Sequence, residues 1–324
     1  MINSMSKRPF PEFVAPMMAN TVKEPFDHPD WIFEPKLDGY RAIAVIDEAG
    51  QPHLWSRNGL TLEIKFPAVF KAVRKLKLRS TILDGEIVAI DDQGIPRFQL
   101  LQKWQKQPTA PIAYYLFDVL WARGADVTGE AVLERRRQLK KIISDVPGIQ
   151  IGGYTEGVGK ELFALAKGKG MEGIVAKRKD SIYQPGRRTS DWLKIKARLQ
   201  QEFVVGGFTE GKGSRKNLGA LLLGAYRNGK LHYFGHSGSG FTEKGIQDAL
   251  KRMKPLSIEK SPFINPPRVS EKIQWLRPKL VCEVTFAEWT DDEQMRQTVF
   301  LGWREDKDSR DVVKEMPSPT ARSS

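Results

Sequence analysis

The sequence predicts an α+β protein with two domains, and three observations support this prediction. At 324 residues the chain is longer than most single domains. Its first 200 residues alternate strand-like segments with amphipathic helical stretches, whereas the remainder consists mainly of short strands punctuated by glycine. The content of 40% hydrophobic and 28% charged residues is typical of a folded chain with a full core. We therefore expect one domain over residues 1–199, a second over 200–315 and a disordered tail over 316–324.

The first 200 residues contain the strands and helices of a mixed or antiparallel sheet. Helices are expected over residues 67–78 and 130–144, where apolar residues recur at helical spacing. Strands are expected where β-branched and aromatic residues cluster between short polar breaks: WIFEPK, RAIAVID, PHLWSR, TILDGEIVAID and IAYYLFDVLW. The first helix also carries cations that form either a solvated face or a nucleic-acid contact: Lys71, Arg74, Lys75 and Lys77.

The remaining residues predict a small β-barrel. Five short strands surround one helix over residues 242–253, and Asn228-Gly229 is the sequence of a tight two-residue hairpin turn. This arrangement favours a barrel of the oligonucleotide-binding (OB) type, with a simple sandwich as the alternative.

Charge and cysteine content limit the function classes. The formal net charge is +13, from 52 Lys and Arg against 39 Asp and Glu, which favours an anionic partner such as a nucleic acid or nucleotide. Cys282 is the only cysteine, so disulfide frameworks and cysteine-rich zinc sites are excluded and a reducing compartment is indicated. The sequence shows neither a signal peptide nor an apolar run of the ~18 residues that would span a membrane. These features predict a cytoplasmic protein with no membrane partner.

A series of short motifs carries the chemistry. The first is Lys36-x-Asp38-Gly39, which alone is weak evidence because three fixed positions recur by chance in charged turns. It is followed in order by further motifs: Ser56-Arg57-Asn58-Gly59, Leu83-Asp84-Gly85-Glu86, Leu116-Phe117-Asp118, Glu172-Gly173-Ile174-Val175-Ala176-Lys177, Trp192-Leu193-Lys194-Ile195-Lys196, and RQTVFLGWREDK over residues 296–307.

This ordered series resembles the signature motifs of ATP-dependent DNA ligases, members of the covalent nucleotidyltransferase superfamily, over residues 31–307. The closest likeness is to the compact ligase module of bacterial end-joining ligases. The resemblance implies an ATP-grasp-like nucleotidyltransferase domain of antiparallel sheets and helices, followed by an OB-fold barrel. It also implies three transfers: AMP from ATP to Lys36, AMP from Lys36 to the 5′-phosphate of a nick, and attack by the 3′-hydroxyl with release of AMP.

The residue types fit such chemistry without the resemblance. A lysine amine forms a labile phosphoramidate with AMP, provided that it loses its proton. Lys194 and Lys196 are two residues apart on a strand and share a face, so we expect them to lower the pKa of Lys36 and to hold the triphosphate. Glu86 lies on an otherwise apolar strand, where a metal ion or a ribose hydroxyl would compensate its carboxylate.

The resemblance assigns a role to each motif residue. Lys36 is the nucleophile, Phe117 stacks on adenine opposite Val175, and Glu34 meets the adenine amino group. Arg41 and Arg57 bind the ribose-phosphate or the 5′-phosphate of the nick, and Asp38 orients the lysine loop. The last motif closes over ATP through Arg304, Asp306 and Lys307. Magnesium, with manganese as an alternative, is held by Glu86 and Glu172.

The implied partner is nicked or broken double-stranded DNA bound by a monomer at the nucleoid, with a Ku-type end-binding protein as a candidate recruiter. Only 35 residues precede Lys36, so we expect no N-terminal DNA-gripping domain and strongly salt-sensitive DNA binding. Two alternatives stay open at this stage. One is an RNA ligase or mRNA-capping guanylyltransferase, and the other is a non-catalytic nucleic-acid-binding protein.

Overall fold

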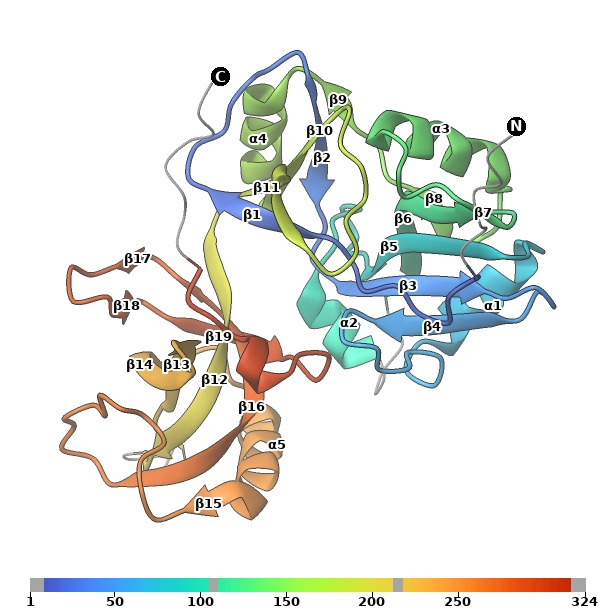
Figure 1. Cartoon of the computed structure of the whole chain (residues 1–324). Coiled ribbons are helices and arrows are strands. Elements are labelled where there is room, and N and C mark those ends of the chain that lie inside the picture. Colours follow the sequence, from blue (N-terminus) through green and yellow to red (C-terminus); the bar gives the residue numbers. More distant parts are fainter. Residues whose placement is uncertain (1–8, 105–109, 212–217, 316–324) are drawn as a thin grey trace. The chain divides into compact units, whose positions relative to one another are not determined.

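The computed structural model describes residues 9–104, 110–211 and 218–315, which form two compact units. Unit 1 ends at Ala197 and unit 2 begins at Arg198. Figure 1 shows the course of the chain through the helices and strands of each unit. The tail expected over residues 316–324 lies outside the described residues.

Unit 1 contains two sheets. The five-stranded sheet has the order β1 (Met18–Val22), β11 (Arg188–Lys196), β10 (Gly173–Arg178), β2 (Trp31–Lys36) and β9 (Thr155–Glu156). The six-stranded sheet has the order β4 (Pro52–Ser56), β3 (Tyr40–Ile46), β5 (Thr81–Ala89), β6 (Ile112–Ala122) and β7 (Ala125–Asp126), with β8 (Ile149–Ile151) also paired to β6. Neighbouring strands are antiparallel except for β1 with β11 and β6 with β8. The mixed sheets expected for this part of the chain are therefore confirmed.

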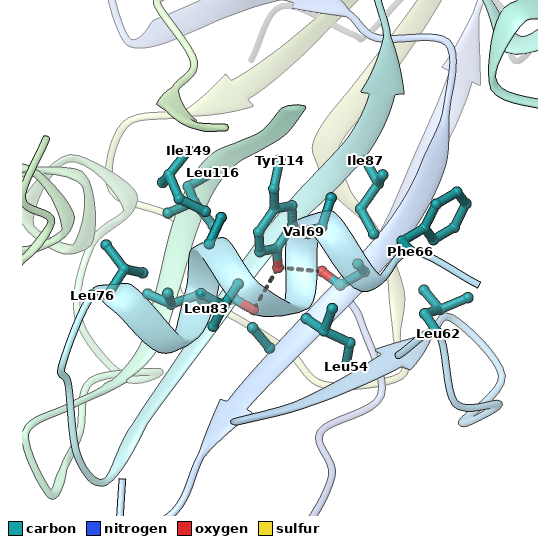
Figure 2. Close-up of a cluster of buried hydrophobic side chains, with 14 of the residues drawn as sticks. Leu54, Leu62, Phe66, Val69, Leu76, Leu83, Ile87, Tyr114, Leu116 and Ile149 are labelled. Atoms are coloured by element: carbon teal, nitrogen blue, oxygen red, sulfur yellow. Dashed lines mark hydrogen bonds between the residues drawn. The ribbon is translucent and has the colours of Figure 1, made fainter. Parts of the chain in front are cut away.

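Helices cover one face of each sheet. Helix α4 (Gly159–Gly168) packs on the five-stranded sheet, where alternate residues such as Phe33, Ile174 and Ile195 are buried against it. On the other sheet, α1 (Pro67–Lys75), α2 (Phe98–Trp104) and α3 (Val132–Ile142) add residues to a second buried cluster. Figure 2 shows Tyr114 inside this cluster, with its hydroxyl donating to the carbonyl oxygens of Ala42 and Leu83 at 2.8 and 3.3 Å.

Both predicted helices of unit 1 are present but shorter than expected. Helix α1 stops at Lys75 rather than residue 78, because Lys77 takes a left-handed backbone conformation with φ of 52° just after the C-cap residue Leu76. Helix α3 runs from Val132 to Ile142, inside the expected range of 130–144, because its C-cap residue Ile143 is already extended.

Unit 2 is built on a six-stranded sheet: β14 (Lys230–Ser237), β13 (Leu221–Arg227), β12 (Leu199–Thr209), β16 (Ile273–Phe286) and β15 (Ser257–Ile258), with β19 (Val299–Trp303) also paired to β16. A small hairpin joins β17 (Glu288–Trp289) to β18 (Met295–Arg296). Helix α5 (Glu243–Met253) starts after Thr242, whose hydroxyl accepts a hydrogen bond from the Gly245 amide at 3.1 Å. The unit is consistent with an OB-fold.

The hairpin expected at Asn228-Gly229 joins β13 to β14, and both turn residues have positive φ, 53° and 73°. In the described part of the chain, none of the helices combines the length and the apolar character needed to cross a membrane.

Candidate active site

The predicted nucleophile lies at the end of β2, on the face of the five-stranded sheet opposite α4. Strands β2, β10 and β11 are neighbours, and residues that pair directly across them project to the same face. Most of the predicted site residues of this sheet lie in two such rows across the strands: Lys36–Gly173–Lys196 and Glu34–Val175–Lys194. Sequence spacing alone placed Lys194 and Lys196 on one face, and the strand register adds Lys36 and Glu34 to it.

Glycines in the motifs are required by close backbone approaches, as Gly39 and Gly173 illustrate. A β-carbon at Gly39 would collide with the carbonyl oxygen of Ile87 on β5, and one at Gly173 would collide with that of Ile195 on β11. Gly173 also has a φ of 146°, which other residues adopt only with strain. These glycines let the loop after Lys36 and the start of β10 lie tightly against neighbouring strands.

Lys36 forms an ion pair with Glu172, the residue just before β10. The Nζ atom of Lys36 lies 2.5 Å from Oε2 of Glu172, and the side chains are 22% and 7% exposed. Burial on its own would lower the pKa of Lys36, but the charge and hydrogen bond of Glu172 raise it above its ordinary value, with smaller contributions from Glu86 and Asp38. The lysine is therefore held as an ammonium ion.

This result corrects the expectation that Lys194 and Lys196 lower the pKa of Lys36. Lys196 pairs with Gly173, which pairs in turn with Lys36, so two strand spacings, or about 10 Å, separate the two lysine backbones. The carboxylates of Glu172, Glu86 and Asp38 act more strongly on Lys36 than these cations do. Asp38 also accepts a hydrogen bond at 3.3 Å from the amide of Phe98, which ties the lysine loop to the start of α2.

Arg41 on β3 is held by a carboxylate that the sequence did not single out. Its Nε and Nη2 atoms each donate to Asp84 at 2.5 Å, and Asp84 is fully buried and also accepts from the Tyr183 hydroxyl at 2.7 Å. Burial alone would lower the pKa of Arg41, but Asp84 raises it. The guanidinium carbon lies 4.6 Å from the ring centre of Phe117. Asp84 thus fixes the predicted phosphate ligand Arg41 beside the predicted adenine platform.

Phe117 is also in contact with Lys177, a second group that sequence reasoning missed. The Lys177 ammonium lies 4.5 Å from the ring centre of Phe117 and 2.8 Å from Glu34 Oε2, while Arg136 Nη1 lies 3.2 Å from Glu34 Oε1. Lys177 is 1% exposed, and this burial lowers its pKa even though Glu34 opposes the shift. Lys177 ends the Glu172-Gly173 motif, so its place in that motif was the available signal.

The remaining predicted residues lie near this cluster, and the carboxylates among them suit a metal ion. Arg57 Nη2 lies 2.6 Å from the Met18 sulfur, and Glu86 pairs in register with Arg41 across β3 and β5. Within the described residues no group of three or more His, Cys, Asp or Glu side chains is arranged to hold a metal. Magnesium commonly uses one or two carboxylates together with phosphate oxygens, so Glu86 and Glu172, which both act on Lys36, fit that pattern.

The last motif forms an ion cluster inside unit 2. Arg304 donates to both oxygens of Asp306, at 2.9 and 2.8 Å, and to Glu283 at 3.1 Å. Lys307 lies 3.0 Å from Glu202, which pairs directly with Glu283 across β12 and β16. Arg304 and Asp306 are 8% and 4% exposed. These two predicted ATP contacts are therefore engaged with carboxylates in their own unit.

Comparison with family models gives two matches. Residues 16–196 match the model described as ATP dependent DNA ligase domain, and residues 214–307 match the model described as ATP dependent DNA ligase C terminal region.

Similar proteins include end-joining proteins and a DNA ligase, all longer than this chain. The chain is 39% identical over 323 residues to the Multifunctional non-homologous end joining protein LigD of Pseudomonas aeruginosa, covering 97% of this chain and 38% of that protein. It is 30% identical to the DNA ligase of Thermococcus fumicolans, covering 85% of this chain and 52% of that protein. The chain thus spans about two fifths of the length of the LigD relatives.

A solved structure titled mycobacterial DNA ligase D complexed with ATP and MES is also similar. It matches with a TM-score of 0.68 and 32% identity, covering 93% of this chain and 98% of that chain. The ligase domain from M. tuberculosis LigD matches with a TM-score of 0.52 and the same identity and coverage.

Proposed function

The chain belongs to the family of ATP-dependent DNA ligases, and from this premise we propose that it seals 5′-phosphate/3′-hydroxyl breaks in DNA through a Lys36-AMP intermediate. The observation that carries the proposal is the 2.5 Å contact between Lys36 Nζ and Glu172 Oε2, on a sheet face shared with Glu34, Lys194 and Lys196. The lysine, a carboxylate that can accept its proton, and cations that can bind phosphates then lie on one face of the sheet.

In the first step the Lys36 amine attacks the α-phosphorus of ATP. Lys36 first gives one of its three Nζ protons to Glu172, which already accepts a hydrogen bond from it. The freed lone pair then forms the N–P bond while the P–O bond to pyrophosphate breaks, and a second Nζ proton leaves to solvent as the phosphoramidate forms. Phe117 stacks on the adenine with Val175 on the other side, and Glu34 contacts the adenine amino group. Lys194 and Lys196 hold the phosphates.

Glu86 and Glu172 would hold a magnesium ion, which supplies positive charge to the phosphates of ATP when it is bound. In the second step AMP moves from Lys36 to the 5′-phosphate of the break, with Arg41 and Arg57 as the guanidinium contacts to that phosphate. In the third step the 3′-hydroxyl attacks the activated phosphate and AMP leaves. The second and third steps depend on positioned phosphates rather than on a separate acid-base pair.

Arg304, Asp306 and Lys307 act in the first step. Their proposed role is to align the pyrophosphate leaving group, which requires the domain over 200–315 to close on the domain over 1–199 and then to reopen. Glu283 and Glu202 pair with Arg304 and Lys307 inside unit 2, so the proposed role requires the pyrophosphate to replace these carboxylates.

The proposed biological setting is end joining in the bacterial cytoplasm, at the nucleoid, by a monomer. Its support is the similarity to LigD proteins, whose names state non-homologous end joining, although the chain covers only part of their length. A Ku-type end-binding protein is the proposed recruiter. Added Ku is then expected to stimulate joining of linear ends while leaving nick sealing unchanged.

A sealing assay tests the function. Nicked DNA, cohesive ends and nicked RNA are each incubated with ATP, NAD or GTP and a divalent metal. We expect joined product from DNA with ATP. Product only from RNA, or only with NAD or GTP, would overturn the proposal.

A further inference from the structure

A basic hollow lies at the end of the six-stranded sheet that is farthest from Lys36. It has a volume of about 650 Å³, and its polar lining consists of Lys77, Arg79, Ser80, Arg123, Lys141 and Ser144. It is formed where the end of α1, the link into β5, the turn after β6 and the end of α3 meet. No acidic side chain lines it, and all of its lining residues belong to the described ranges.

In the described part of the chain, no carboxylate pairs with the four cations of the basic hollow. Lys77, Arg79, Arg123 and Lys141 are all exposed, and within the described residues their side chains make no ion pair or hydrogen bond. Like charges gathered without a counter-ion repel one another, so the arrangement costs free energy until an anion binds. Helix α1, which ends just before Lys77, carries three further exposed cations: Lys71, Arg74 and Lys75.

The backbone of the basic hollow is also unusual. Lys77, Ser80 and Arg123 have φ values of 52°, 42° and 50°, and they are three of the six non-glycine residues with positive φ in the described chain. Glycine or asparagine usually occupies such positions, because other side chains cost roughly 1 kcal/mol or more there. Lys77 and Arg123 therefore place positive charge in the hollow although their backbone conformation is unfavourable for their residue types.

We propose that the basic hollow binds phosphates of the DNA backbone on one side of the break. The inference rests on the proposed function, because it takes DNA as the anion. Strand β5 begins beside Ser80, and Glu86 of the proposed nucleotide site follows five residues after Thr81. At about 3.4 Å per residue this separates the two sites by roughly 17 Å. The proposal places the duplex along β5, and because DNA rises about 3.4 Å per base pair the contact then falls about five base pairs from the break.

The test compares two sets of substitutions that remove equal charge. One variant carries Lys77→Gln, Arg79→Gln and Arg123→Gln. The matched control carries Lys160→Gln, Lys167→Gln and Lys169→Gln, at exposed positions in or next to α4. Affinity for a nicked duplex is measured over a range of salt concentrations. The duplex is either long on both sides of the nick or shortened on one side to about four base pairs.

We expect the hollow variant to bind roughly tenfold more weakly at low salt and its log–log salt slope to fall by about 2 to 3, with the control close to wild type. Shortening the duplex on one of the two sides of the nick should weaken DNA binding by the wild type and the control. It should leave DNA binding by the hollow variant unchanged. Wild-type affinity in the hollow variant, or an equal loss in the control, would overturn the proposal. Transfer of AMP from ATP to the protein is measured in parallel. Its absence from the wild type would refute the proposed function rather than the basic hollow.

Discussion

Replacing Asp84 by asparagine removes the charge that holds Arg41. The substitution keeps nearly the same shape, but the buried guanidinium loses its counter-ion and the Tyr183 hydroxyl loses a charged acceptor. Breaking a buried pair by neutralising one partner costs about 3 to 5 kcal/mol. Because the Arg41 side chain is 23% exposed, water can partly solvate it, and we expect the lower end of that range, about 3 kcal/mol.

A loss of this size is measurable by calorimetry. For a unit of this length each kcal/mol lowers Tm by about 2 to 4 °C, so the transition of unit 1 should fall by roughly 6 to 12 °C. ATP affinity should fall as well, because Arg41 would no longer be fixed 4.6 Å from the ring centre of Phe117.

The matched control is Asp180→Asn. Asp180 also accepts two hydrogen bonds from an arginine, Arg178, at 2.7 and 3.2 Å, but its side chain is 72% exposed. Exposed ion pairs contribute little, so its Tm should stay close to that of the wild type. The reasoning would be refuted if Asp84→Asn also stayed within about 1 °C of the wild type.

Three further outcomes follow from buried groups. Burial would raise the pKa of Asp306, but Arg304 lowers it below its usual value of 3.8, so its stabilisation is complete above about pH 4 and lost as pH falls further. The Tm of unit 2 should therefore drop more steeply as pH falls below about 4 in the wild type than in Asp306→Asn; equal slopes would contradict this. Burial raises the pKa of Cys282, so alkylation followed by mass spectrometry at pH 8 should modify it only after unfolding, and rapid native labelling would argue against its burial. Gly173→Ala should lose several kcal/mol of stability and most adenylation, because its β-carbon meets the Ile195 carbonyl; a fully stable variant would show that the strands can separate there.

Patterns that are local in sequence were predicted well. The strands around the motifs, the Asn228-Gly229 hairpin and the shared face of Lys194 and Lys196 depend on spacing and turn chemistry within a few residues. The helix ends were less accurate, because Lys77 adopts a conformation that its residue type does not favour.

Contacts between distant segments were not predictable from the sequence. Asp84 is 43 residues from Arg41, and Glu172 is 136 residues from Lys36, so nothing in the local pattern specifies either pair. The direction of the Lys36 pKa shift depends above all on Glu172. Reasoning from nearby cations alone therefore gave the wrong direction.

The most direct test of the account is to locate the AMP after incubation with ATP and a divalent metal. The protein is digested under conditions that preserve the phosphoramidate, and the modified peptide is sequenced by mass spectrometry. The account predicts a single AMP on Lys36 and none in a Lys36→Arg variant that keeps the wild-type Tm. AMP on another residue, or its persistence in the variant, would contradict the assignment of Lys36 as the nucleophile.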